Sequence, residues 1–252
     1  MKRIKIIVAY DGTNYNGWQI QPAGITIEGI LNQALTELTK EPVTVIGASR
    51  TDSGVHALGN VAVFDTNTRI PPEKISYALN QRLPEDIVVQ NSCEVPPDFH
   101  PRRCASRKTY EYKILNRTFP MPLNRYDSYF TYRKIDVEKM RQAARQLTGE
   151  HDFKSFCSIH AQSETTVRTI YSLDVKKEQD LITIRVTGSG FLYNMVRIIA
   201  GTLLQVGTGE RIPDEMPDIL QAKDRGAAGP TAPAHGLTMI GIEFCESILQ
   251  SP

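Results

Sequence analysis

Small residues surround a single carboxylate in the segment GASRTDSGVHALGN, residues 47–60. The carboxylate belongs to Asp52, and the small residues beside it allow another part of the chain to approach the backbone closely. Two interpretations are open. Asp52 caps the amides that follow it in a hairpin loop, or a rigid loop presents its carboxylate to a substrate.

A lone cation interrupts the apolar stretch GFLYNMVRIIAGTLLQVG, residues 190–207. Apolar residues cover most of the circumference of the helix predicted over 192–206, so we expect that helix to be buried on nearly all sides. The cation, Arg197, then needs a carboxylate or polyanion partner, because an unpaired buried charge is strongly destabilising. The alternative is a side chain that extends its charged head into water.

Cations are concentrated between Phe99 and Arg125, where seven of them accompany one acid, in a chain of formal net charge +1. Tyr110 and Tyr112 alternate with them. Cations beside aromatic rings suit a nucleic acid, because they neutralise phosphates and provide surfaces on which bases stack. A solvated strand face is the alternative. The seven cations are Arg102, Arg103, Arg107, Lys108, Lys113, Arg117 and Arg125.

Other chemistries have weaker support in the sequence. The four cysteines form no CxxC pair and the five histidines no HxxxH pair, which disfavours a metal site. Residues 188–190 lack the rest of a dinucleotide-binding fingerprint, and no GxxxxGK[ST] phosphate loop occurs. No apolar stretch reaches the ~18 residues of a membrane span. The balanced charge excludes a uniformly basic nucleic-acid coat and an acidic tail protein.

The elements that must position Asp52 follow a βαββαβ order in residues 1–100, the predicted first domain. Apolar runs between turn residues predict strands over 4–10, 43–48, 60–66 and 87–95. Thr26 is predicted to cap a helix that runs to Thr39 with apolar residues at helical spacing. Pro71 and Pro72 open a second helix.

The predicted second domain, residues 101–252, repeats that order with strands over 107–116, 168–176, 181–187 and 236–244. Asp136 caps a helix that Gly149 stops, and the apolar helix carries Arg197. Residues 207–235 are predicted to be an irregular connection with one short helix. Two such halves predict an α+β fold with antiparallel sheets and helices on one face.

Seven segments, in this order, resemble bacterial tRNA pseudouridine synthases of the TruA family almost from end to end. RTDSGVHA is the most specific part, and Ser53 departs from the family, which usually has Ala there. We expect the Ser53 hydroxyl to donate to the neighbouring carboxylate. The segments are YDGTNYNGWQIQP (10–22), TIEGILNQAL (26–35), GASRTDSGVHALG (47–59), FHPRRCASRKTYEYKI (99–114), HDFKSF (151–156), GFLYNMVRIIAGTLLQVG (190–207) and GPTAPAHGL (229–237).

The resemblance implies two ferredoxin-like βαββαβ halves that share one extended sheet, with a basic active-site cleft between them, in a cytoplasmic homodimer. It also implies that uridine becomes pseudouridine at positions 38, 39 and 40 of the tRNA anticodon stem-loop. By motif position, Asp52 is the catalytic aspartate, Tyr110 the active-site tyrosine and Arg197 the arginine that pairs with the aspartate. The expected substrate-binding residues are Tyr110, Leu237 in the pocket, Arg50, which helps to displace the target base, and Arg102, Arg103, Arg107 and Lys108.

This isomerisation adds and removes nothing, so it requires no redox cofactor, nucleotide or metal. Asp52 has three possible routes: attack at C1′, addition to C6, or removal of a C2′ proton. Each route needs the ionised carboxylate, which a nearby Arg197 favours. Two other function classes stay open: a catalytically silent RNA-binding module, and a metal nuclease, which usually needs more clustered acids than Asp52 alone.

Overall fold

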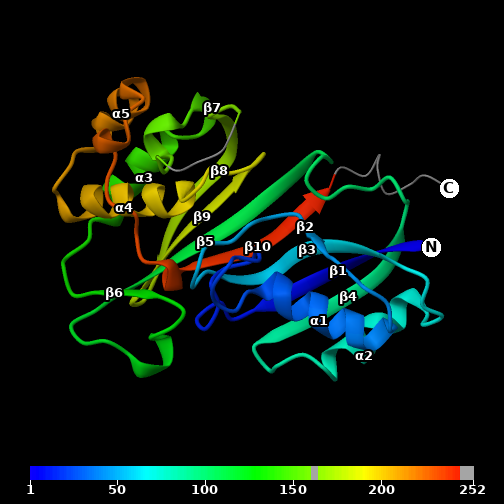
Figure 1. Ribbon diagram of the computed structural model, residues 1–252. Helices are drawn as coiled ribbons and strands as arrows, with labels where there is room; N and C mark the ends of the chain where they lie inside the picture. Colours follow the sequence, from blue (N-terminus) through cyan, green and yellow to red (C-terminus); the bar gives the residue numbers. More distant parts are fainter. Residues whose placement is uncertain (160–163, 245–252) are drawn as a thin grey trace. The chain divides into compact units, whose positions relative to one another are not determined.

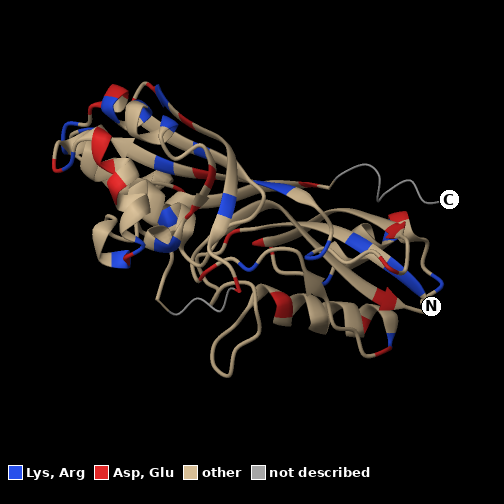
Figure 2. Ribbon diagram, turned by 90° about the horizontal axis from the view of Figure 1, so that it is seen from above, with Lys and Arg blue, Asp and Glu red and all other residues tan. Residues whose placement is uncertain are grey.

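A computed structural model of the chain describes residues 1–159 and 164–244. The chain divides into two units, one containing Met1–Ser106 and residues 239–244, the other containing Arg107–Thr238. The described strands make one extended mixed sheet of ten strands. Basic and acidic residues are interspersed along the ribbon of both units (Figure 2), in keeping with the small net charge. Among the described residues, no helix is long and apolar enough to cross a membrane.

The first unit has the strand order β4-β1-β3-β10, with β2 also paired to β3 (Figure 1). All register-defined pairs of this unit are antiparallel, as predicted. The strands and helices of this unit occur in the predicted βαββαβ order. Helix α2 packs against α1 and β4. The elements are β1 (Lys2–Tyr10), α1 (Ile27–Thr39), β2 (Ile46–Gly47), β3 (His56–Thr66), a 3-10 turn (Pro72–Lys74), α2 (Ile75–Asn80), β4 (Ile87–Val95) and β10 (Leu237–Phe244).

Helix α1 confirms its predicted start and buried face. The Thr26 hydroxyl accepts a hydrogen bond from the Gly29 amide at 3.2 Å, which satisfies one of the amides that a helix start leaves unpaired. Leu31 and Leu35, four residues apart, are fully buried. On β1, Ile4, Ile6 and Val8 are fully buried as well, so the alternate residues of one strand face contribute to the core of this unit.

Strand β2 is shorter than the predicted strand over 43–48. The Val43 amide donates to the Thr36 hydroxyl at 3.2 Å, and the Val45 amide donates to Asn32 Oδ1 at 2.8 Å. Side chains of α1 therefore take the amides that a longer strand would use for pairing, and only Ile46–Gly47 pairs with β3.

The second unit has the strand order β5-β9-β8-β7, with β6 beside β5, and helices α3 and α4 contact each other. Its helices and strands are β5 (Ser106–Asn116), β6 (Tyr129–Thr131), α3 (Val137–Arg145), β7 (Gly149–Asp152), β8 (Val167–Glu178), β9 (Leu181–Gly188), α4 (Met195–Thr208) and α5 (Met216–Ala222). Its 3-10 turns are Pro122–Asn124, Lys154–Phe156, Pro213–Glu215, Arg225–Ala227 and Ala234–Gly236. The predicted irregular connection thus holds one short α-helix, α5.

The purely antiparallel arrangement predicted from the sequence is wrong at β6, which runs parallel to the end of β5 with Tyr129 opposite Ile114. Residues 117–128 leave β5 and return in the same direction, as a parallel pair requires. β6 and β7 have three and four residues, too few to show the alternation from which a strand is predicted.

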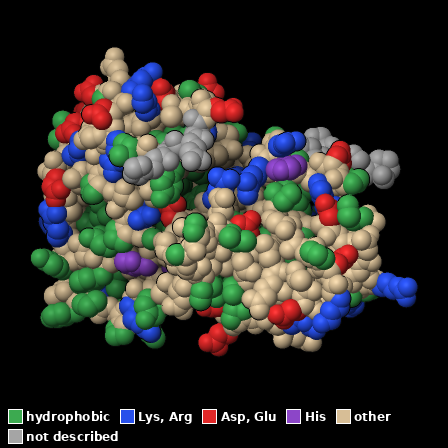
Figure 3. All heavy atoms as spheres, viewed as in Figure 1, with side chains coloured by type: hydrophobic (Ala, Val, Ile, Leu, Met, Phe, Trp, Pro, Cys, Tyr) green, Lys and Arg blue, Asp and Glu red, His purple; other side chains and the backbone are tan. Residues whose placement is uncertain are grey.

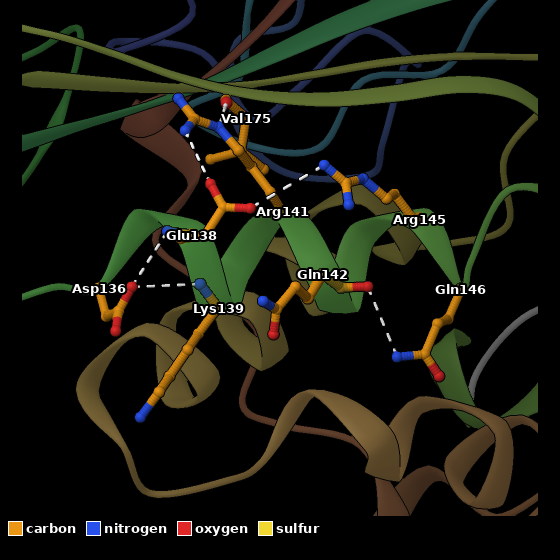
Figure 4. A network of polar contacts seen from close by, with 8 residues as sticks. All are labelled: Asp136, Glu138, Lys139, Arg141, Gln142, Arg145, Gln146 and Val175. Atoms are coloured by element: carbon orange, nitrogen blue, oxygen red, sulfur yellow. Dashed lines mark hydrogen bonds and ion pairs between the residues drawn. The ribbon is translucent and has the colours of Figure 1, made fainter.

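Helix α3 begins at its predicted cap and is tied to β8 (Figure 4). Asp136 Oδ1 accepts hydrogen bonds from the amides of Glu138 and Lys139 at 3.1 and 3.2 Å. Arg141 Nε donates to the Val175 carbonyl oxygen at 2.8 Å. This bond holds the helix against the strand, while Glu138 also pairs with Arg141 on the helix surface at 3.1 Å.

Candidate active site

Asp52 lies on the loop between β2 and β3, in the first unit. Its side chain is half-buried, whereas Thr51 and Val55 are buried. The Val55 amide donates to the Asp52 carbonyl oxygen at 3.1 Å. Gly54, between them, has a φ of +76°, which glycine adopts without steric cost. The backbone therefore turns sharply directly after the residue that bears the carboxylate.

A second segment, residues 12–18, runs against this loop. The Trp18 amide donates to the Thr51 carbonyl oxygen at 3.1 Å. Gly17 has a φ of +83°, and a Cβ atom there would lie 2.5 Å from the same oxygen. Only glycine permits this approach, so the peptide that precedes Asp52 is held by main-chain contact.

Ser53 contacts the same segment. Its hydroxyl donates to the Tyr15 carbonyl oxygen at 3.1 Å, and the Gly54 amide donates to that oxygen at 3.3 Å. The expected bond from Ser53 to the Asp52 carboxylate is therefore wrong, because the hydroxyl is committed to a main-chain acceptor across the loop. Both bonds hold the part of the loop that follows Asp52 in the sequence.

His56, the first residue of β3, lies at the end of the Asp52 loop. It faces Asp11, which directly follows β1. Its Nδ1 accepts a hydrogen bond from the Gly12 amide at 3.1 Å and lies 3.0 Å from Asp11 Oδ1. The amide and hydroxyl of Thr13 donate to the same carboxylate. Burial raises the pKa of Asp11, but the Thr13 hydrogen bonds and His56 outweigh it and hold the pKa below its ordinary value.

Three predicted tRNA contacts, Arg50, Arg102 and Arg103, are exposed in the first unit. Arg102 Nε donates to the Gly47 carbonyl oxygen at 2.7 Å, which fixes its guanidinium beside the start of the Asp52 loop. Burial and the charge of Arg50 lower the pKa of Arg102. The two guanidinium groups are thus within electrostatic reach of each other, an arrangement that an anion such as phosphate relieves.

In the second unit, Tyr110 lies on β5 opposite Val186 of β9, and its side chain is buried. Its ring meets the ring of Phe191 edge to face, with centroids 5.2 Å apart and planes inclined by 84°. This contact fixes the orientation of the Tyr110 ring.

Arg107 and Lys108 lie on opposite faces of β5, since side chains alternate along a strand. Lys108 is half-buried and shares the face of Tyr110. Arg107 is exposed, and its guanidinium carbon lies 4.9 Å from the ring centroid of Tyr171. The structure therefore separates two cations that the sequence groups together.

Arg197 lies in the first turn of α4 and is half-buried. The helix begins at Met195, later than predicted, because Asn194 has a left-handed φ of +61°. Arg197 Nε donates to the Ala232 carbonyl oxygen at 2.7 Å, and Nη1 donates to Asn194 Oδ1 at 2.9 Å. The Ala232 amide donates in return to the Arg197 carbonyl oxygen at 3.1 Å. Oxygen atoms from two segments thus set the direction of the guanidinium.

Tyr112 connects this arginine to Leu237, the buried first residue of β10. Its hydroxyl donates to the Pro233 carbonyl oxygen at 2.9 Å, and a Cβ atom on Gly236 would lie 2.7 Å from its ring. Burial raises the pKa of Tyr112, although the charge of Arg197 opposes that shift. The phenol is therefore neutral and anchors the chain that leads into Leu237.

The predicted functional side chains therefore occur in two sets, one in each unit. Each set contains side chains suited to acid–base chemistry on a nucleobase. The sequence analysis missed the role of Asn194, although an asparagine directly before an apolar helix is a signal for a left-handed residue. Within residues 1–159 and 164–244, no three His, Cys, Asp or Glu side chains gather as a metal site requires. The sets are Arg50, Asp52, Arg102 and Arg103 in the first unit, and Arg107, Lys108, Tyr110, Arg197 and Leu237 in the second.

A family model described as tRNA pseudouridine synthase matches residues 6–102 and 143–244. A tRNA pseudouridine synthase A of Thermoanaerobacter sp. (strain X514) is 50% identical over 244 residues, which cover 97% of this chain and 100% of the relative. Its counterpart in Acetivibrio thermocellus is 47% identical with the same coverage. A crystal structure of the archaeal box H/ACA sRNP Nop10–Cbf5 complex gives a TM-score of 0.36 at 12% identity, covering 89% of this chain and 60% of that one, too low to carry an argument.

Proposed function

The chain belongs to the tRNA pseudouridine synthase family, and from this premise we propose that it isomerises uridine to pseudouridine at positions 38, 39 and 40 of the anticodon stem-loop of tRNA. The bond between N1 and C1′ of the uridine breaks, the uracil turns, and a bond forms between C5 and C1′. C5 loses its proton and N1 gains one. The observation that supports this chemistry best is a carboxylate, Asp52, on a loop fixed by main-chain contacts.

Asp52 acts in this proposal as the nucleophile or base. It attacks C1′, adds to C6 or takes a C2′ proton, and each route uses the ionised carboxylate. Hydrogen bonds from the amides of Trp18 and Val55 to the carbonyl oxygens of Thr51 and Asp52 hold the backbone on both sides of it. A catalytic group that needs no rearrangement on substrate binding retains the advantage of orientation.

Arg197 pairs with the Asp52 carboxylate in the proposed site. The bonds to Ala232 and Asn194 set the direction of the half-buried guanidinium, whose planar fork matches the two oxygen atoms of a carboxylate. An arginine fork beside a carboxylate favours the ionised form of the carboxyl and fixes its orientation.

Tyr110 and Leu237 hold the target base, and Arg50 helps to displace it from the stem. The ring of Tyr110 is oriented by Phe191 and can stack on uracil, and its phenol assists removal of the C5 proton. Moving a paired uridine out of its stack costs a few kcal/mol, which contacts to the RNA backbone must offset.

Phosphates of the tRNA backbone supply those contacts. Arg102 and Arg103 are exposed in the first unit, with Arg102 oriented by the Gly47 carbonyl oxygen. Lys108 lies on the Tyr110 face of β5, and Arg107 extends the basic surface to the opposite face beside Tyr171. Backbone recognition suits an enzyme that acts at several neighbouring positions.

The proposed enzyme is a homodimer that acts in the cytoplasm. Large apolar side chains are exposed on the excursion between β5 and α3, where Phe119 is 72%, Leu123 89% and Tyr132 76% exposed. Figure 3 shows hydrophobic side chains gathered in that part of the second unit. A second copy is the proposed cover for these side chains. Light scattering should give twice the mass of one chain, and Leu123→Glu should lower it.

Tritium release tests the reaction. The protein is incubated with tRNA labelled at C5 of uridine, and pseudouridine is mapped afterwards in the anticodon stem-loop. Stoichiometric release, with pseudouridine at positions 38 to 40, supports the proposal. Binding without release would indicate a silent RNA-binding module, and cleavage of the RNA that EDTA abolishes would indicate a metal nuclease.

A further inference from the structure

Two side chains from two strands, Tyr10 of β1 and Asn60 of β3, brace Ser49 and Thr51, the residues on either side of Arg50 and shortly before Asp52. Asn60, on β3, is fully buried. Its Nδ2 donates to the Ser49 carbonyl oxygen at 3.0 Å and to the Tyr10 hydroxyl at 3.3 Å. The Tyr10 hydroxyl is also 2.8 Å from the Thr51 hydroxyl, within hydrogen-bond distance.

The amide of Asn60 has one orientation that satisfies these partners. Both hydrogens on Nδ2 are used, and Oδ1 accepts a hydrogen bond from the Val61 amide at 2.9 Å. Turning the amide over would place Oδ1 against the Ser49 carbonyl oxygen, so two acceptors would face each other without a proton. A buried amide with such partners cannot rotate without losing several hydrogen bonds.

A β-bulge aims Tyr10 at the loop. β1 and β3 pair Val8 with Asn60 but Tyr10 with Ala57, so the register shifts between these pairs. Bulges change the direction of side chains at strand ends and occur often beside active sites. Here the shift lies where the buried Tyr10 leaves β1 and its hydroxyl meets Thr51.

We propose that Asn60 and Tyr10 are positioning residues for Asp52, with Asn60 fixing the Ser49 carbonyl and, through the Tyr10 hydroxyl, the Thr51 side chain. The inference rests on the proposed role of Asp52. Neither residue touches the substrate. They act because a displacement of about 1 Å in a reacting group can cost ~10²-fold in rate, and this brace keeps the peptides before Asp52 in one place.

Two isosteric changes remove the central hydrogen bond. Thr51→Val and Tyr10→Phe each delete one of the two hydroxyl oxygens. The single-turnover rate at saturating enzyme should fall ~10- to 100-fold in each variant, with the Kd for tRNA unchanged. Thr51→Ser keeps the hydroxyl and should recover most of the rate. The double variant should be no slower than the slower single one, because both changes remove the same bond.

Asn80, which is exposed, provides a control for Asn60. Its Nδ2 donates to the Val89 carbonyl oxygen at 2.9 Å and its Oδ1 accepts from the Val89 amide at 2.8 Å, so it makes similar bonds in the same unit, away from the Asp52 loop. Asn60→Ala should lose rate at temperatures well below its Tm, whereas Asn80→Ala should lower only Tm. Equal rates for the two folded variants would overturn the proposal. If Asn60→Ala does not fold, Thr51→Val and Tyr10→Phe decide.

Asp52→Asn, measured in the same assay, separates this inference from the proposed function. An inactive Asp52→Asn together with wild-type rates for Thr51→Val and Tyr10→Phe overturns the positioning role alone. Near wild-type turnover in Asp52→Asn overturns the role of Asp52 and the positioning role with it. Slow Thr51→Val and Tyr10→Phe, a recovered Thr51→Ser and an inactive Asp52→Asn support both.

Discussion

Asp52 and Arg197 are held in place by different means. Around Asp52 the main chain is fixed: the Thr51 carbonyl accepts from the Trp18 amide, and the Asp52 carbonyl accepts from Val55. Around Arg197 the side chain itself is fixed, since its guanidinium donates to Ala232 and Asn194. The contacts that hold the loop at Thr51 and Asp52 use main-chain atoms, whereas the direction of the charge on α4 depends on the contacts of the guanidinium.

This difference decides which substitutions are informative in each unit. At Asp52, an isosteric change alters the chemistry and leaves the loop in place. At Arg197, even a change that keeps the charge removes the planar fork on which its orientation depends. The residues that contact these two groups differ in the opposite way. Gly17, beside the Asp52 loop, cannot be replaced because its φ is +83°. Ala232 contacts Arg197 only through main-chain atoms.

Asp52→Asn should have the largest effect. An amide can serve neither as the nucleophile nor as the base, so we expect turnover to fall at least ~10⁴-fold with tRNA affinity retained. Tritium release and a filter-binding Kd measure the two quantities. Asp65→Asn is the control, since Asp65 is half-buried in the same unit but pairs with Arg3 at 2.7 Å. Residual turnover near the wild-type rate would contradict the catalytic role.

Arg197→Lys should lower turnover by ~10²- to 10³-fold, because a compact ammonium does not reproduce the bidentate geometry of a guanidinium. Arg197→Met should cost more activity than stability, since an apolar residue of similar volume suits the helix. Single-turnover kinetics and thermal unfolding measure both effects. Arg141→Lys is matched, because Arg141 is half-buried and its Nε also donates to a carbonyl, that of Val175. Equal effects at the two arginines would remove the special role of Arg197.

Tyr110→Phe keeps the aromatic surface and loses the phenol. If the phenol assists removal of the C5 proton, turnover should fall ~10²-fold while the Kd for tRNA is unchanged. Tyr112→Phe is the comparison, since it loses the hydrogen bond to the Pro233 carbonyl oxygen and should lower the free energy of unfolding by about 1 kcal/mol with a smaller loss of turnover. An unchanged rate in Tyr110→Phe would leave the ring as a stacking surface only.

The sequence predicts elements well where one strong periodic pattern decides them. α1, β4 and β9 begin and end within two residues of their predicted bounds. The predicted strand over 43–48 is reduced to Ile46–Gly47, because the amides of Val43 and Val45 bond to side chains of α1. β6 escapes prediction because its partner is the end of β5, and no local pattern records that pairing.

The candidate site divides in the same way. Asp52 and Arg197 stand out as a lone carboxylate and a lone cation in uniform surroundings, and the family motifs contain both. Asn60 and Asn194 do not stand out, because their importance comes from partners that the fold brings near, such as Ser49 and the Arg197 guanidinium. Spacing along the chain therefore identifies the reactive groups more readily than the residues that hold them.

Neutralising Arg102 and Arg103 should weaken tRNA binding and make its dependence on salt shallower. For every phosphate that the variant no longer neutralises, the slope of log K against log salt should fall by ~0.7 to 0.9. Binding titrations over a range of salt concentrations measure that slope. Arg82→Gln and Arg145→Gln are the controls, since both residues are exposed and lie on or after helices. An unchanged slope in the double variant would place the RNA surface elsewhere.

The smallest effect concerns acid and the segment that holds the Asp52 loop. Asp11 accepts two hydrogen bonds from Thr13 and lies beside His56, and these contacts keep its pKa below the ordinary value. A carboxyl with a lowered pKa contributes stability above the unfolded value of about 3.9, and this contribution is lost as the pH falls through the lower folded pKa. Because half of the Asp11 side chain is exposed, solvent limits its contribution to ~0.5 kcal/mol.

Asp11→Asn should therefore lower the free energy of unfolding slightly at pH 7 and not at all below the folded pKa, where the wild-type carboxyl is also neutral. Denaturant unfolding at the two pH values measures the difference. If the Asp11 variant lost equal stability at both pH values, packing rather than ionisation would explain the loss, and acid would have no specific effect on the segment that holds the Asp52 loop.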